Sequence, residues 1–226
     1  MIPGWLISAI TFPGVILHEA AHELFCKITN TKVIDIQYYK FSVEKNEPAG
    51  YVIHEKSSNY FKTFLITLGP LFINTLLAFM MGIIAVSKGT GPFALLFGWL
   101  TFCFGMHAIP SLHDSWNLLK ESSEAIMKFN IFALVGIIIS PILSLASLFQ
   151  IVWFDAIYAF GILYMAKELI ITGFILKIPK IVMVIVPIVV MYGILFPVLK
   201  QKKETHTKAI IAAIVSIIVL SISILI

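Results

Sequence analysis

The sequence contains no arginine and few charged residues of either sign. All 16 basic residues are lysine, and charged residues make up 12% of the 226-residue chain, which is roughly half of the share typical of soluble domains. The net charge of +4 is small, and the lysines are scattered along the chain. A basic face that could bind nucleic acid is therefore not expected, and we predict no nucleic-acid partner.

Cysteine is also scarce. The two cysteines, Cys26 and Cys103, both lie in apolar runs, which argues against a disulfide framework and against a CxxC metal site. The N-terminus lacks the positively charged region and the small-residue cleavage site of a secretory signal. We therefore expect the first apolar segment to be retained.

Apolar residues are abundant: they make up 59% of the chain and give a mean hydropathy of +0.98. The pattern predicts an all-α polytopic membrane protein with about six or seven transmembrane helices, since each span needs about 20 mostly apolar residues. We expect one domain over residues 1–226, integral to a lipid bilayer, in the plasma membrane of a prokaryote. The predicted spans are 3–27, 61–87, 92–119, 129–150, 156–176, 181–199 and 208–226.

Residues 33–55 interrupt this apolar pattern between the first two predicted spans. They mix charged residues with β-branched and aromatic ones, and KNEPAG in their middle supplies turn residues. This pattern predicts two short strands that form a β-hairpin beside the membrane. Residues 1–120 would form the core of the domain, and residues 129–226 would add further transmembrane helices.

The first apolar run, FPGVILHEAAHELFC, contains His18, Glu19, His22 and Glu23. Ionisable groups inside a membrane span are costly, so they indicate a function by default. His18 and His22 share one helix face, at the spacing with which two imidazoles bind one zinc ion. Glu19 completes an HExxH motif, in which the glutamate is the general base. The alternative is a polar patch at a helix interface or along a proton path.

A third ligand is expected from another span, because catalytic zinc sites usually have three protein ligands and a water. The stretch FGMHAIPSLHDSWNLL offers His107, His113 and Asp114. The first and third predicted spans cross in the same direction, which puts the histidine pair and Asp114 at similar depths near the hairpin. Asp114 is therefore the preferred ligand and His107 the competing one. Cys26 could also face the metal, but free cysteine usually packs as a small apolar residue.

The second predicted span contains TLGPLFINTLLAF. Gly69 and Pro70 are expected to break its helix, and Asn74 follows on the next turn. A lone asparagine in a membrane helix most often bonds to a neighbouring helix. The functional interpretation places Asn74 near the metal, where it would hold substrate or orient a ligand.

These segments together resemble the site-2 protease family of intramembrane zinc metalloproteases. HEAAH matches the family's HExxH, GPLFINTLLA is similar to its GPxxNxxLA segment, and HAIPSLHD is similar to its NPxPxxLDG-type segment. The order along the chain also agrees, and the match covers roughly residues 10–120. The resemblance implies a Zn2+ ion bound by His18, His22 and Asp114, with Glu19 as the general base.

The third segment departs from the family pattern and indicates a divergent branch. It lacks the asparagine that stabilises the oxyanion in the family, and His107 lies nearest that position. Ser115 replaces the glycine that follows the aspartate. We expect His107, if neutral, or Asn74 to donate the hydrogen bond that stabilises the oxyanion.

The reaction implied by the resemblance is zinc-dependent hydrolysis of a peptide bond in or next to a transmembrane segment. The substrate would be a membrane protein or peptide, and its helix must unwind locally because its own hydrogen bonds shield the peptide bonds. The hairpin edge could bind the unwound segment as an added strand. His54 and Glu55 could form a lid over the site, although such residues are more often simply solvated.

Two other functions are compatible with the same motif. ZIP-type transporters carry HExPHE on a membrane helix, where this chain has HEAAHE without the proline and without a partner HNxxDG segment. A catalytically silent relative that binds membrane proteins is the other alternative. The intact HExxH motif argues against it, because such a protein would not need Glu19.

Overall fold

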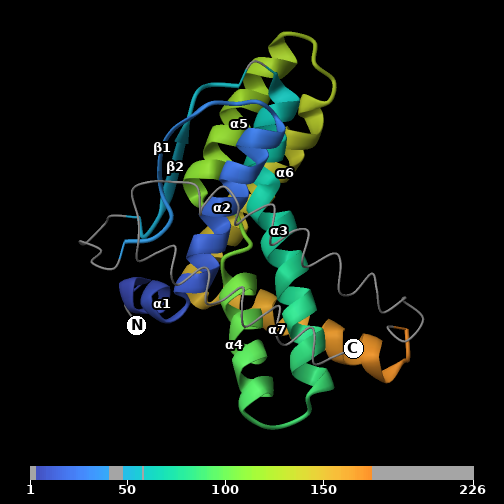
Figure 1. Cartoon of the computed structure of the whole chain (residues 1–226). Helices are drawn as coiled ribbons and strands as arrows, with labels where there is room; N and C mark the ends of the chain where they lie inside the picture. The colour runs from blue at the N-terminus through green and yellow to red at the C-terminus, as the bar shows by residue number, and fades with distance from the viewer. Residues whose placement is uncertain (1–3, 41–47, 58, 175–226) are drawn as a thin grey trace.

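The computed structural model describes residues 4–40, 48–57 and 59–174, and most of them are helical. Figure 1 shows the order of the elements along the chain. They are α1 (Gly4–Ile10), α2 (Phe12–Ile28), β1 (Val33–Gln37), β2 (Tyr51–His54), α3 (Tyr60–Ser87), α4 (Pro92–Met106), α5 (Leu112–Met127), α6 (Ala133–Leu148), the 3-10 helix η1 (Phe149–Val152) and α7 (Phe154–Ile171).

Helix α3 is the central element, because α2, α4, α5 and α7 all pack against it. It runs nearly the length of the molecule, with α2 and α5 beside its first half and α4 and α7 beside its second half (Figure 1). The apolar core forms where α2, α3 and α4 meet, around the fully buried side chains of Leu77, Met81 and Phe97. This packing holds α2, which carries the HExxH motif, against α3 and α4.

Two described helices are long and apolar enough to cross a membrane, α3 and the continuous stretch Ala133–Val152. A third candidate is the pair α1 and α2, if these two helices, which are bent by 86° at their junction, count as one span. The predicted spans 61–87 and 129–150 correspond to the first two candidates. The predicted break at Gly69 and Pro70 is wrong, because α3 continues through both residues as one helix. Helix α7 occupies most of the predicted span 156–176, and the predicted spans 181–199 and 208–226 lie outside the described residues.

The prediction of one continuous span over residues 92–119 is wrong. Helix α4 ends at Met106 and α5 begins at Leu112. The chain breaks there because Pro110 has no N–H to continue the helix and Ser111 starts a new one. Ser111 and Asp114 form a capping box, in which each side chain bonds the backbone N–H of the other residue. The break also puts Asp114 in the first turn of α5.

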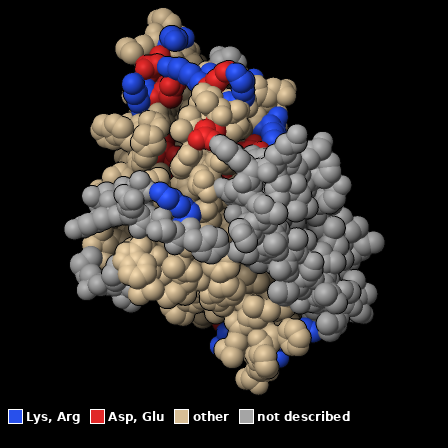
Figure 2. All heavy atoms as spheres, turned by 60° about the vertical axis from the view of Figure 1, so that its left-hand side comes forward, with Lys and Arg blue, Asp and Glu red and all other residues tan. Residues whose placement is uncertain are grey.

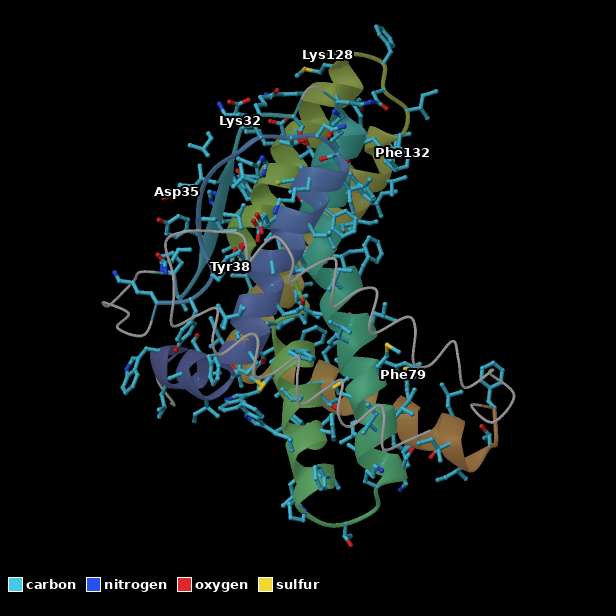
Figure 3. The ribbon with its side chains drawn as sticks, viewed as in Figure 1. Lys32, Asp35, Tyr38, Phe79, Lys128 and Phe132 are labelled. Carbon is cyan, nitrogen blue, oxygen red and sulfur yellow. The ribbon has the colours of Figure 1, made fainter. Side chains whose placement is uncertain are left out.

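The predicted β-hairpin is confirmed. Strands β1 and β2 pair antiparallel with Gln37 opposite Tyr51, and an irregularity in β1 lies between Val33 and Asp35. The sheet lies beside α2 (Figure 1). The buried Tyr38 directs its side chain toward α2 (Figure 3) and donates a hydrogen bond to Glu23. The hairpin is therefore attached directly to the helix that carries the motif.

Charged side chains gather at one end of the molecule. Figure 2 shows lysine and acidic side chains together at the upper end of one face. Lys32 and Lys128 lie at this end, whereas Phe79 lies in the opposite half of α3 (Figure 3). At the same end, Lys56 pairs with Glu121 at 3.0 Å and with Glu124 at 2.9 Å, which joins the segment after β2 to α5. Such surface pairs contribute little stability.

Gly14 is expected to be required for the contact between α2 and α4. A Cβ atom at Gly14 would lie 1.9 Å from the carbonyl oxygen of Cys103, whereas a Cβ at Gly98 would meet nothing within 4 Å. Gly14→Ala should therefore destabilise the protein by about 1–3 kcal/mol or more through overpacking. Gly98→Ala should be neutral or stabilising, because alanine favours helix. Thermal unfolding of both variants in detergent tests this, and equal melting temperatures would contradict it.

Candidate metal centre

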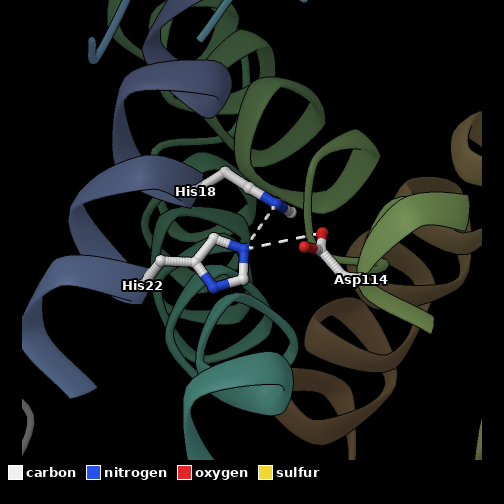
Figure 4. A group of neighbouring side chains, drawn as sticks. All are labelled: His18, His22 and Asp114. Carbon is white, nitrogen blue, oxygen red and sulfur yellow. Dashed lines mark hydrogen bonds and ion pairs between the residues drawn. The ribbon is translucent and has the colours of Figure 1, made fainter. Parts of the chain in front are cut away.

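Three potential metal ligands from two helices converge on one point. His18 and His22 lie on the same face of α2, and their Nε2 atoms are 3.2 Å apart. Asp114 at the start of α5 brings its Oδ2 atom to 3.7 Å from Nε2 of His22. All three donor atoms lie within 4.8 Å of one another, as Figure 4 shows from the side of α2. The structure thus brings together the three ligands predicted from the sequence.

The orientation of both imidazoles is set by backbone carbonyl groups. Nδ1 of His18 lies 2.7 Å from the carbonyl oxygen of His107. Nδ1 of His22 lies 2.9 Å from the carbonyl oxygen of Ile66. Because a carbonyl oxygen can only accept, each Nδ1 must carry a proton. The neutral rings therefore direct their Nε2 lone pairs toward each other and toward Asp114, as in metal sites whose ligands are oriented by backbone carbonyls.

This set of donors fits a divalent metal ion. Two nitrogen lone pairs and one carboxylate face the same point, and no donor hydrogen lies between them when the rings are neutral. In a tetrahedral zinc site, ligand bonds of about 2.0–2.2 Å place neighbouring ligand atoms roughly 3.3–3.5 Å apart. The separations of 3.2 Å and 3.7 Å are close to that geometry, and the third pair of donors, on His18 and Asp114, lies within 4.8 Å. Three protein ligands would leave the fourth position for water or substrate, as in catalytic zinc sites.

Asp114 is held in place by the capping box of α5. Its Oδ2 atom accepts hydrogen bonds from the backbone N–H of Ser111 at 3.0 Å and from the Ser111 hydroxyl at 2.5 Å. Burial acts to raise the pKa of Asp114, but the positive charge of His22 in its protonated form and the hydrogen bond from Ser111 outweigh burial and hold the pKa below its ordinary value. The carboxylate is thus ionised, which is the form that binds a metal.

A cavity of about 530 Å³ opens beside the three donors, between α2, α3, α5 and the hairpin. Glu19 lines this cavity and is itself buried. Gly50 packs directly against it, since a Cβ at Gly50 would lie 2.8 Å from Cγ of Glu19. The backbone of the hairpin therefore limits where the Glu19 carboxylate can move.

Glu23 has different surroundings from Glu19. Its carboxylate pairs with Lys27 at 2.5 Å and accepts a hydrogen bond from Tyr38. It does not line the cavity. No role of Glu23 was predicted from the sequence, although Lys27 one helical turn later was a signal for an intrahelical ion pair. Glu23 anchors the hairpin, and Glu19 is the acidic residue of the motif that faces the cavity.

His107 and Asn74 are placed differently from the other expected site residues. The Nε2 atom of His107 lies 2.8 Å from the hydroxyl oxygen of Thr11, which itself donates to the carbonyl of Ile7 at 2.7 Å. Asn74 is fully buried, and its Nδ2 donates to the carbonyl oxygens of His107 at 2.9 Å and of Gly14 at 3.3 Å. Neither side chain lines the cavity. The part of His107 at the metal centre is its backbone carbonyl.

The remaining candidates lie around the three donors without joining them. His113 and His54 line the cavity, and Nδ1 of His54 bonds the carbonyl oxygen of Glu55 at 2.8 Å. Cys26 is completely buried. Within residues 4–40, 48–57 and 59–174, His18, His22 and Asp114 form the one group of this kind that could hold a metal ion.

Comparison of the chain with protein-family models, with curated proteins and with solved structures finds no match.

Metal binding is expected to depend on His22 and Asp114 but not on His113. His22→Ala and Asp114→Asn each remove one donor, so zinc affinity should fall by more than the roughly 10–100-fold caused by loss of a group that only orients a ligand. His113→Ala changes a side chain of the same cavity outside the donor group and should keep the affinity. Zinc per protein, measured by mass spectrometry after dialysis, checks this. Full zinc occupancy in the Asp114→Asn variant would show that Asp114 is not a metal ligand.

Proposed function

We propose that this chain is a polytopic membrane protein and a zinc-dependent endopeptidase that hydrolyses peptide bonds in or next to transmembrane segments. In this proposal it is a divergent relative of the site-2 protease family. The observation that carries it is the convergence of His18, His22 and Asp114 beside a cavity that Glu19 also lines. Two imidazoles, one carboxylate and a nearby free carboxylate are the set of groups that zinc peptidases use.

Each residue of the centre has a distinct part in the proposed reaction. Zinc bound by the three donors would polarise the substrate carbonyl and make water a stronger nucleophile near neutral pH. The Glu19 carboxylate takes a proton from the attacking water while the water oxygen forms a bond to the carbonyl carbon of the substrate. It then gives that proton to the nitrogen of the breaking C–N bond. Gly50 keeps Glu19 directed into the cavity during both transfers.

The location of the cavity favours substrates next to a membrane span. Thr63, Ile66 and Thr67 line it, and all three lie in the first two turns of α3. At 1.5 Å per residue, they are within about 10 Å of the start of this candidate span. Polar and charged side chains, including Lys56 and Lys120, line the same cavity. A peptide segment leaving the bilayer would reach the three donors at this depth.

The hairpin gives an extended substrate a wall to bind. The consecutive residues Gly50, Tyr51 and Val52 all line the cavity. Tyr51 and Val52 are consecutive residues of β2, and successive side chains of a strand point to opposite faces. Their shared lining of the cavity therefore indicates that β2 presents its backbone edge. Strand β1 covers the other edge of β2. A substrate strand could therefore pair with β2 as an added strand, which would keep its peptide bonds unwound.

Glu19→Gln is expected to separate metal binding from hydrolysis. The amide keeps the size of the side chain but cannot accept the proton of water, so cleavage should fall by about 10²–10⁴-fold, the usual contribution of a general base. Zinc content should stay at the wild-type level because Glu19 is not one of the three donors. Cleavage of a reconstituted single-span substrate, followed by gel and mass spectrometry, measures the first quantity. Wild-type cleavage by Glu19→Gln would refute the proposed mechanism.

Val52→Pro tests whether β2 pairs with substrate. The N–H of Glu55 bonds Lys32 beside β1, and N–H groups alternate between the two edges of a strand. The N–H of Val52 therefore faces the cavity edge, and proline removes it. We expect a raised KM with unchanged zinc content, whereas Val52→Ala, which keeps the N–H, should cleave normally. An unchanged KM in Val52→Pro would exclude strand pairing at this position.

A further inference from the structure

Pro70 lies inside α3 and removes one hydrogen bond from that helix. In an α-helix the N–H of residue i bonds the carbonyl of residue i−4. Residue 70 would thus bond the carbonyl of Ile66, but proline has no N–H to donate. The carbonyl of Ile66 instead accepts the Nδ1 proton of His22 at 2.9 Å, and both residues are buried. The Ile66 carbonyl therefore orients His22, and it is the same carbonyl that lacks a helical donor because residue 70 is proline.

The second histidine is oriented in the same way at a second proline. The carbonyl of His107 would bond the N–H groups of residues 110 or 111 if α4 continued. Residue 110 is proline, and the N–H of Ser111 donates to Asp114. The His107 carbonyl accepts Nδ1 of His18 at 2.7 Å and Nδ2 of Asn74 at 2.9 Å. Both imidazoles thus donate to carbonyls whose helical donors are missing.

We propose that Pro70 is a positioning residue of the metal centre, which acts on His22 through the carbonyl of Ile66. The proposal rests on the metal centre proposed above. With an N–H at position 70, the Ile66 carbonyl would align along the helix toward its own donor. His22 would then share this acceptor, and its Nε2 lone pair would be less firmly directed at the metal. Asn74 has the corresponding role for His18. It donates a hydrogen bond to the His107 carbonyl, which is the acceptor that orients the His18 ring.

The alternative is that Pro70 only shapes α3 for packing against its neighbours. Pro141 lies inside α6 in the same chemical situation, because it deprives the carbonyl of Ile137 of its helical donor. Neither histidine ligand bonds that carbonyl. Pro141→Ala therefore restores a helical hydrogen bond away from the metal centre and serves as the matched control for Pro70→Ala.

The experiment compares the zinc affinity of the wild type, Pro70→Ala and Pro141→Ala, each as the full chain in detergent, by competition with a chromophoric chelator. We expect Pro70→Ala to bind zinc about 10–100-fold more weakly, the effect typical of losing a group that orients a ligand. Pro141→Ala should bind like the wild type. The metal-free Pro70→Ala protein should not melt earlier, because alanine favours helix far more than proline does.

Each outcome has a defined meaning. Wild-type affinity in Pro70→Ala overturns the positioning role, and so does an equal loss in both variants. Absence of zinc binding by the wild type itself would instead refute the proposed metal centre. A readout that needs no variant is the imidazole nitrogen spectrum of the zinc-loaded wild type, where His22 should carry its proton on Nδ1. A proton on Nε2, with zinc on Nδ1, would overturn the inference even if Pro70→Ala did not fold.

Discussion

The candidate metal centre depends on carbonyl groups that have lost their helical donors. A ligand histidine needs one nitrogen fixed by an acceptor so that the other can face the metal. In a helix bundle nearly every carbonyl is already used within its own helix. Here Ile66 and His107 supply the two acceptors, because prolines follow them at the positions where helical donors would stand. The proline inside the continuous helix α3 and the break between α4 and α5 are therefore part of the site.

The hairpin and α2 form one unit through two glutamates of α2, Glu19 and Glu23. Burying a carboxylate is costly unless it is paired, and Glu23 is paired with Lys27 and Tyr38. That contact ties the end of β1 to α2 one residue after His22. The opposite strand contacts α2 at Gly50, which rests on Glu19. The two glutamates thus have different roles. Glu23 holds the hairpin against α2, and Glu19 lines the cavity.

Side-chain ligands could be predicted from the sequence more readily than the groups that orient them. The spacing of His18 and His22 indicated a shared helix face. Asp114 was also predicted as a ligand, although the continuous span 92–119 on which its predicted depth relied is broken between Met106 and Leu112. His107 and Asn74 were predicted to act through their side chains, whereas the structure places the backbone carbonyl of His107 at the centre, and neither side chain lines the cavity. Every residue has a carbonyl, so its availability shows in a sequence only indirectly, through a proline four residues later at Ile66 and three residues later at His107.

The break between α4 and α5 leaves polar backbone groups that need hydrogen-bond partners, and one of these partners comes from α6. Irregular buried backbone is tolerated where its polar groups find hydrogen-bond partners. The carbonyl of His107 is bonded by His18 and Asn74, the N–H of Ser111 by Asp114, and the carbonyl of Pro110 by the Ser147 hydroxyl of α6 at 2.6 Å. Helix α6 lies beyond the segments that resemble site-2 proteases, yet it completes this set of bonds. The break that precedes Asp114 is therefore closed in part by Ser147, in the last turn of α6.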